Sequence, residues 1–180
     1  MKQPSTPQEI RDFGKILRAD PQKYLRIVNE WIAQNPSDAT ALFERHYAWL
    51  ALGEPQKALA DLDSAIALEP DNPADYFVRG RTKHQLGDYQ HALEDFDRGE
   101  AINPDEWHEH AIGLLFQAHC HARLGDESAA LSYCSRLPDY LWTPGLFGVP
   151  PGGREEVAGQ LRQIARKIRS GGSAASPQTE

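Results

Sequence analysis

A histidine-rich stretch holds the side chains of this sequence that come nearest to a metal site. His108, His110, His119, Cys120 and His121 lie close together in the chain, and imidazole nitrogen and thiolate sulfur are the ligands that zinc favours. If residues 119–121 are helical, however, consecutive side chains point in divergent directions and do not converge on one ion. The spacing therefore predicts no metal site.

Arrangements that would indicate other chemistry are also missing from the sequence. It contains no glycine-rich phosphate loop, no nucleophile elbow and no pair of carboxylates at catalytic spacing. The two cysteines, Cys120 and Cys134, are too few for a disulfide framework, which agrees with a reducing compartment. We therefore expect neither an enzyme nor a bound cofactor.

Composition and charge narrow the class of protein further. The 180 residues are 40% hydrophobic and 25% charged, which is the balance of one soluble domain. The chain begins without a signal-peptide core and has no apolar run of the roughly 18 residues that a membrane span needs, so a cytoplasmic location is expected. Residues 154–169 carry a net charge of +3, but residues 1–153 sum to −9. Such an acidic body predicts no binding to nucleic acid.

An internal repeat sets the expected architecture. Residues 46–72 and 80–106 align without a gap at an offset of 34, and a fixed period of this length is the mark of a repeat protein. The equivalent residues include Gly53 and Gly87, Ala58 and Ala92, Leu62 and Phe96, and Pro70 and Pro104.

This unit resembles the tetratricopeptide repeat, which has a large residue at position 4, small residues at positions 8 and 20, an aromatic residue at 24 and proline at 32. Tyr76, Gly80, Ala92, Phe96 and Pro104 match that pattern in residues 73–106. The resemblance implies an all-α, right-handed superhelix of about four repeats, at residues 5–38, 39–72, 73–106 and 111–137. The first of these repeats is degenerate, and Pro138 cuts the fourth one short.

Helix boundaries are marked in the sequence as well. Asp20-Pro21 and Glu54-Pro55 are typical of helix starts, because the acid can cap free amides and proline suits the first turn. Glycine at positions 53, 87 and 125 is expected to end the first helix of three repeats. His46 stands where the repeat has a small residue, which is expected to loosen the contact between the helices.

The residues after the repeats fall into three segments. Residues 138–153, PDYLWTPGLFGVPPGG, are apolar but contain too much proline and glycine for a helix. They are expected to pack against the last repeat; the alternatives are that they fill the inner groove of the repeats or form a docking motif. Residues 154–169 are predicted to be an amphipathic helix that caps the superhelix, and residues 170–180 a disordered tail.

The resemblance also indicates where a partner would bind. In the family, the inner groove is lined by the first helix of each repeat, and here that surface combines aromatic side chains and an acid with a basic patch of Arg81, His84, His119 and Arg123. The pattern lacks the basic clamp that binds chaperone tails, and it predicts binding of an apolar or amphipathic, partly acidic segment of another protein. The predicted groove residues are Phe43, Glu44, Tyr47, Phe77, Arg81, His84, Leu115, Phe116, His119 and Arg123.

Two alternatives remain open for the function. One is a superhelix whose groove is filled by its own chain and which acts through its outer face or by forming a homodimer. The other is a protein that binds a metal or small ligand at His108, His110 and His119, which requires residues 107–110 to fold over the groove.

Overall fold

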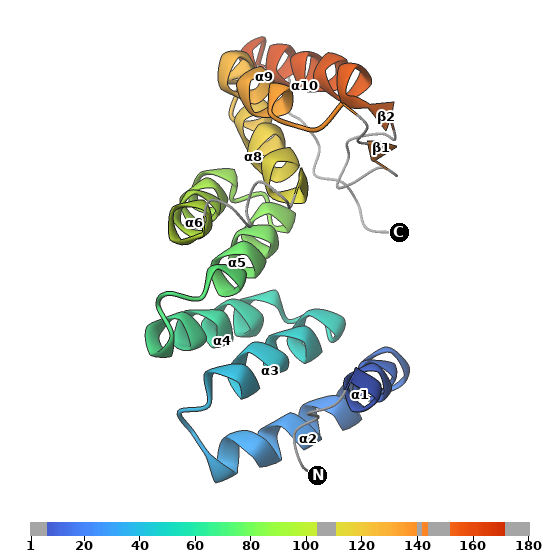
Figure 1. Cartoon of the computed structure of the whole chain (residues 1–180), viewed down its shortest axis with the longest axis vertical. Helices are drawn as coiled ribbons and strands as arrows, with labels where there is room; N and C mark the ends of the chain where they lie inside the picture. Colours follow the sequence, from blue (N-terminus) through green and yellow to red (C-terminus); the bar gives the residue numbers. More distant parts are fainter. Residues whose placement is uncertain (1–6, 104–110, 140–141, 144–151, 172–180) are drawn as a thin grey trace. The chain divides into compact units, whose positions relative to one another are not determined.

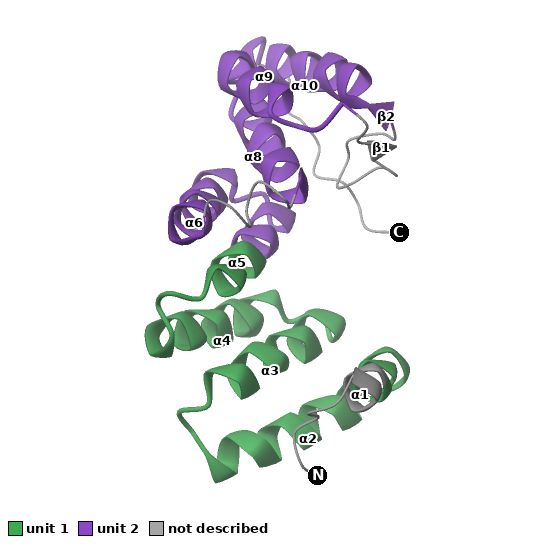
Figure 2. Ribbon diagram, viewed as in Figure 1, with its two compact units in different colours: residues 1–79 green, residues 80–180 purple. Residues whose placement is uncertain are grey.

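The structure, a computed structural model of the chain, describes residues 7–103, 111–139, 142–143 and 152–171. These residues form α-helices joined by short turns, with one pair of two-residue strands (Figure 1). The chain divides into two compact units, residues 1–79 and 80–180, so that the division falls within one helix, α5 (Figure 2). None of the described helices is long and apolar enough to cross a membrane.

The first unit contains α1 (Pro7–Ala19), α2 (Pro21–Gln34), α3 (Ala39–Ala51), α4 (Pro55–Leu68) and the beginning of α5 (Pro73–Gln85). Its core is aromatic at the N-terminal end, where the ring of Phe13 stacks on Tyr24 at 4.1 Å and lies 4.8 Å from the ring of Trp31. Alanine fills the tight positions, and Ala41 and Ala48 are fully buried. Small side chains here let the helices approach closely enough to bury the larger ones.

The helix boundaries test the sequence signals directly. Asp20 caps α2 as predicted, since its side chain accepts a hydrogen bond from the backbone N–H of Lys23 at 2.9 Å. Glu54 makes no side-chain cap on α4, so that prediction was wrong; the longer carboxylate instead pairs with Lys57 at 3.5 Å. Among the described residues, the aspartates Asp38, Asp88 and Asp126 also cap helices, and the sequence reading missed them.

A glycine follows the first helix in three of the helix pairs, as predicted. Gly53, Gly87 and Gly125 have φ values of 74°, 82° and 83°, in the left-handed region that favours glycine. At His46, the repeat position where we expected a loosened contact, the imidazole is fully buried and its ring lies 3.8 Å from the ring of Tyr47. The helix pair therefore accommodates the larger side chain within its packing.

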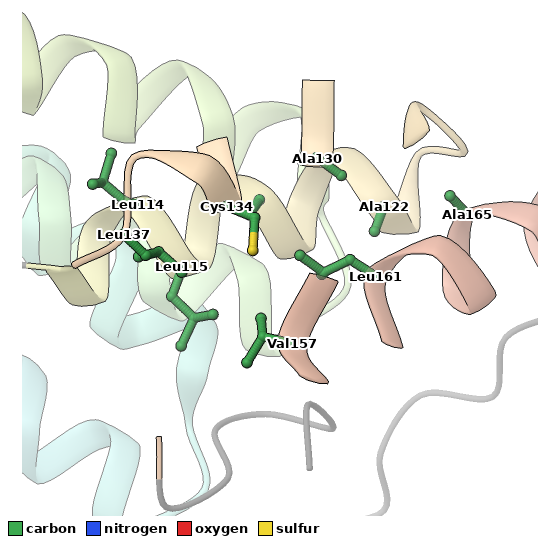
Figure 3. Packing of buried hydrophobic residues seen from close by; sticks show 10 residues of the cluster. Leu114, Leu115, Ala122, Ala130, Cys134, Leu137, Val157, Leu161 and Ala165 are labelled. Atoms are coloured by element: carbon green, nitrogen blue, oxygen red, sulfur yellow. The ribbon is translucent and has the colours of Figure 1, made fainter. Parts of the chain in front are cut away.

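The second unit contains the rest of α5, then α6 (Tyr89–Ile102), α8 (Ala111–Arg123), α9 (Glu127–Ser135) and α10 (Arg154–Arg169). The strands β1 (Trp142–Thr143) and β2 (Gly152–Gly153) pair in the antiparallel direction just before α10. A core cluster joins α8, α9 and α10, as the close view in Figure 3 shows. Its buried members are Leu114, Leu115, Ala118, Ala122, Ala130, Cys134, Leu137, Val157, Leu161 and Ala165.

Helix α10 packs along both α8 and α9 through one face. Val157 and Leu161 are 1% and 0% exposed, and burying each side chain contributes about 1.5–3 kcal/mol. On the surface beside this core, Glu127 of α9 forms ion pairs with Arg166, at 3.2 Å, and with Arg169. The apolar stripe read from the sequence thus meets a surface that the chain itself supplies.

The expected packing of residues 138–153 concerns mainly residues 140–141 and 144–151, which lie outside the described part of the chain, as does the tail from residue 172. The ends of the segment are described and are held together. Residues 142–143 pair with residues 152–153, and Arg154 binds the backbone oxygen of Leu137 at 3.1 Å and the carboxylate of Asp139.

Candidate functional site

Three predicted groove residues lie on one stripe of α3 in the first unit. Phe43, Glu44 and Tyr47, which we call the α3 face, are all partly exposed, and the two rings meet edge to face with centroids 5.6 Å apart. A helix places residues i and i+4 on the same side, which explains why the rings touch. Phe77, in the part of α5 that belongs to this unit, is also only partly buried. These aromatic residues of the first unit are therefore less buried than those of its core.

Glu44 follows Phe43 in the sequence, and its carboxyl group is partly buried beside a tyrosine. The hydroxyl of Tyr24, a residue that is 2% exposed, donates a hydrogen bond to Oε2 of Glu44. Burial raises the pKa of the Glu44 carboxyl above its ordinary value, although the Tyr24 hydrogen bond acts in the opposite direction. The charged form of this side chain is thus poorly solvated.

The second unit holds the predicted basic patch, and the structure changes what that patch can do. His84 of α5 and His119 of α8 are 4% and 3% exposed, and Nε2 of the first lies 2.7 Å from Nδ1 of the second. Burial, together with nearby Arg123, lowers the pKa of His84 to about 4. Burial, His84 and Arg123 lower the pKa of His119 to about 3. Near neutral pH both imidazole rings are therefore uncharged. The positive charge of the predicted basic patch then comes from Arg81 and Arg123.

Leu115 and Phe116 are covered in the structure. Each is 3% exposed: Leu115 belongs to the core cluster with α10 (Figure 3), and the ring of Phe116 stacks on Phe96 at 5.6 Å and lies 5.0 Å from the ring of His84. A partner would contact these two side chains only by displacing packing inside the second unit.

A tyrosine that the sequence reading did not single out organises this region. The ring of Tyr89, at the start of α6, lies 5.3 Å from the ring of His84 and 6.2 Å from that of His119. The guanidinium carbon of Arg123 lies 4.7 Å from the same ring centroid, which is cation–π distance. We call the partly buried Arg81 and Arg123 the arginine pair. The sequence signal that could have located Tyr89 at the start of a helix was the preceding aspartate, Asp88, which caps α6.

Metal-ligating side chains do not gather in the part of the chain that the structure describes. Among those residues, no group of three His, Cys, Asp or Glu side chains is placed to hold a metal ion. His108 and His110, which the alternative site requires, lie outside the described residues. Cys120 and Cys134 are buried, and burial raises the pKa of both thiols, which favours the unreactive protonated form.

Comparison with known proteins identifies the fold. Residues 76–106 match the sequence model of a family described as tetratricopeptide repeat. No curated protein matches the chain.

Solved structures are similar over most of the chain. A crystal structure of MamA has 16% sequence identity and a TM-score of 0.66, covering 87% of this chain and 89% of that one. MamA 41-end from Desulfovibrio magneticus RS-1 has 16% identity and a TM-score of 0.68, covering 90% and 89%. A Podosopora anserina putative kinesin light chain with nearly identical TPR-like repeats has 17% identity and a TM-score of 0.63, covering 93% and 98%. Together with the helix order described above, these likenesses confirm the predicted all-α superhelix.

Proposed function

We propose that this chain, of which residues 76–106 match the tetratricopeptide-repeat model and which has the fold of a repeat superhelix, is a protein-interaction module that binds a segment of a partner protein. The observation that carries the proposal is the open aromatic surface of the first unit. Phe43, Tyr47 and Phe77 are only partly buried, whereas a comparable aromatic residue in the core, Phe96, is 0% exposed. Partly exposed aromatic side chains are the usual anchors of protein interfaces.

The partner segment that suits these surfaces is apolar or amphipathic, with an acidic group at one end. Its apolar side chains would contact the aromatic residues of the first unit. In the second unit, considered by itself, the arginine pair would bind an acidic group of a partner, since guanidinium groups form strong, directional hydrogen bonds with carboxylates. The arginine pair contributes this role without help from the neutral His84 and His119.

The buried members of the predicted groove have a supporting role in this proposal. Leu115, Phe116, His84 and His119 fill the space beneath the surface of the second unit. His84 and His119 pack against Tyr89, over which Arg123 lies, and Phe116 packs against His84. They would therefore position an arginine for the partner rather than touch the partner themselves. We assign the protein no catalytic activity, which repeat scaffolds of this kind generally lack.

A pull-down with matched variants tests the proposal. Wild type, Phe77→Glu and Leu68→Glu are immobilised and exposed to native lysate, after circular dichroism has shown that each is folded. Leu68 is the control because it is a large apolar residue that is 43% exposed on α4, a helix that carries none of the predicted groove residues. We expect the captured partner to be lost with Phe77→Glu and retained with Leu68→Glu. Loss with Leu68→Glu alone would instead favour binding through the other face or through a second copy of the chain.

A further inference from the structure

We propose that Glu44 makes the α3 face a receptor for a cation, namely a lysine or arginine side chain of the partner that lies next to an apolar residue. This inference rests on the proposed function of the α3 face and adds a charge preference to it. The reason lies in how this chain stabilises its other buried acids.

Two buried acids at equivalent repeat positions receive a cation from the chain itself. Asp61 is 5% exposed and accepts two hydrogen bonds from the guanidinium of Arg45, at 2.6 and 2.8 Å. Asp95, 34 residues later, is 3% exposed and pairs with Lys83 at 2.8 Å. Removing a carboxylate from water is unfavourable unless a cation or several hydrogen bonds replace the lost solvation, and in both places the chain provides the cation.

A third buried acid is stabilised differently. Asp75 is 2% exposed and lies in the first turn of α5, where the free amides of the helix favour negative charge. The side-chain amide of Asn72 also donates a hydrogen bond to it at 3.2 Å. Burial and the nearby carboxylate of Glu69 raise the pKa of Asp75 to about 6, so this acid is buried with a weakened tendency to ionise and, among the described residues, without a cation.

Glu44 has neither kind of support. It lies in the middle of α3, far from the free amides at the start of that helix. Among the described residues it forms no ion pair, and its hydrogen-bond partner there is the single hydroxyl of Tyr24, at Oε2. A carboxylate accepts about four hydrogen bonds, and Glu44 is only partly buried, so its carboxylate retains capacity for a further donor.

The neighbouring rings suit the same ligand. Phe43 precedes Glu44 and Tyr47 follows it by less than one helical turn, so a cation held by the carboxylate would also lie near two aromatic rings. The methylene stem of lysine or arginine is apolar and would pack against these partly buried rings. A carboxylate beside two aromatic rings on one side of α3 thus selects a long cationic side chain over an acidic or a neutral one.

Peptide titrations test this preference. The probes are acetyl-Leu-Arg-Leu-Leu-amide and the same peptide with glutamine or glutamate in place of arginine, and binding is followed by chemical shifts in ¹⁵N–¹H spectra. The proteins are wild type, Glu44→Gln and Glu54→Gln. The Glu44→Gln amide oxygen still accepts from Tyr24, so the fold is retained, and Glu54 is a matched control because its side chain is 50% exposed and caps nothing.

We expect wild type to bind the arginine peptide roughly tenfold more tightly than the glutamine peptide, a ratio in the range of a partly desolvated ion pair with cation–π contacts. The ratio should fall to about one in Glu44→Gln and persist in Glu54→Gln. Equal binding of the arginine and glutamine peptides by wild type would overturn the cation receptor and leave the proposed function intact. Tighter binding of the glutamate peptide, or no binding of any peptide, would also overturn it, and the pull-down with Phe77→Glu would judge the proposed function separately.

Discussion

Two glycines in helices should respond to the same substitution in opposite directions. Gly80 lies in the middle of α5, and a Cβ placed there would meet Cε1 of Phe96 at 2.8 Å, Cδ1 of the same ring at 3.0 Å and the backbone oxygen of Ala92 at 3.1 Å. Gly159 lies in α10, and a Cβ placed there meets nothing within 4 Å. Alanine at both positions therefore separates the packing effect from the helix effect.

The surroundings of the two glycines set the expected change in the free energy of unfolding for each variant. Replacing glycine by alanine inside a helix stabilises by about 1 kcal/mol. At Gly80 the clash acts against this gain, because Phe96 is fully buried and its ring stacks on Phe116, so it has little room to move. Overpacking of this kind costs about 2–3 kcal/mol. The net expectation is a loss of about 1–2 kcal/mol for Gly80→Ala and a gain of up to about 1 kcal/mol for Gly159→Ala.

Urea denaturation followed by circular dichroism measures both variants against wild type. A difference of about 1 kcal/mol corresponds to a shift of roughly 2–4 °C in Tm for a chain of this length, so thermal melts provide a second readout. Gly80→Ala should unfold earlier than wild type and Gly159→Ala later. The expected values depend on the close contact of Gly80 in α5 with Phe96 in α6. Equal changes in stability for the two variants, or a Gly80→Ala variant more stable than wild type, would refute that contact.

Two further predictions concern buried polar groups. His84 and His119 have pKa values lowered to about 4 and about 3 in the folded chain but about 6.5 when unfolded, so the unfolded state binds more protons below pH 6.5 and stability falls as the pH drops. When the pH falls from 7.5 to 5.5, the free energy of unfolding measured by urea titration should therefore drop by about 2–3 kcal/mol more in wild type than in the double variant His84→Gln/His119→Gln. An equal drop in the two proteins would contradict this prediction. Arg45→Met should lower the free energy of unfolding by about 2–3 kcal/mol, because it leaves the carboxylate of Asp61 buried without its cation. The double variant Arg45→Met/Asp61→Leu should recover most of that stability. If it does not, the loss comes from the packing of the Arg45 side chain and not from the unpaired charge.

The fold was predictable from the sequence because its signals are local and repeated. The offset of 34 residues predicts where equivalent helices lie, and the glycines at 53, 87 and 125 adopt the left-handed conformation that a helix end requires. The capping signals were less certain because a carboxylate must also have the right length. Asp20 reaches a free amide, whereas Glu54 does not.

The candidate site was predictable only in part, because helical position does not reveal what covers a side chain. Leu115 occupies a groove position of its helix, but it joins the core cluster with α10, a helix that follows it by about forty residues. His84 and His119 were read as basic surface residues, yet they come from different helices and bury one another. Phe43, Glu44 and Tyr47 on α3 are partly buried, and their contact with a partner stays a prediction.

Site-specific photo-crosslinking tests the central claim most directly. p-Benzoylphenylalanine replaces Tyr47 on the α3 face in one variant and the exposed Leu68 on α4 in another, and both are irradiated in native lysate. The account predicts a discrete crosslinked partner from position 47 and none from position 68. Crosslinking from position 68 alone would contradict the claim that the aromatic face holds the partner.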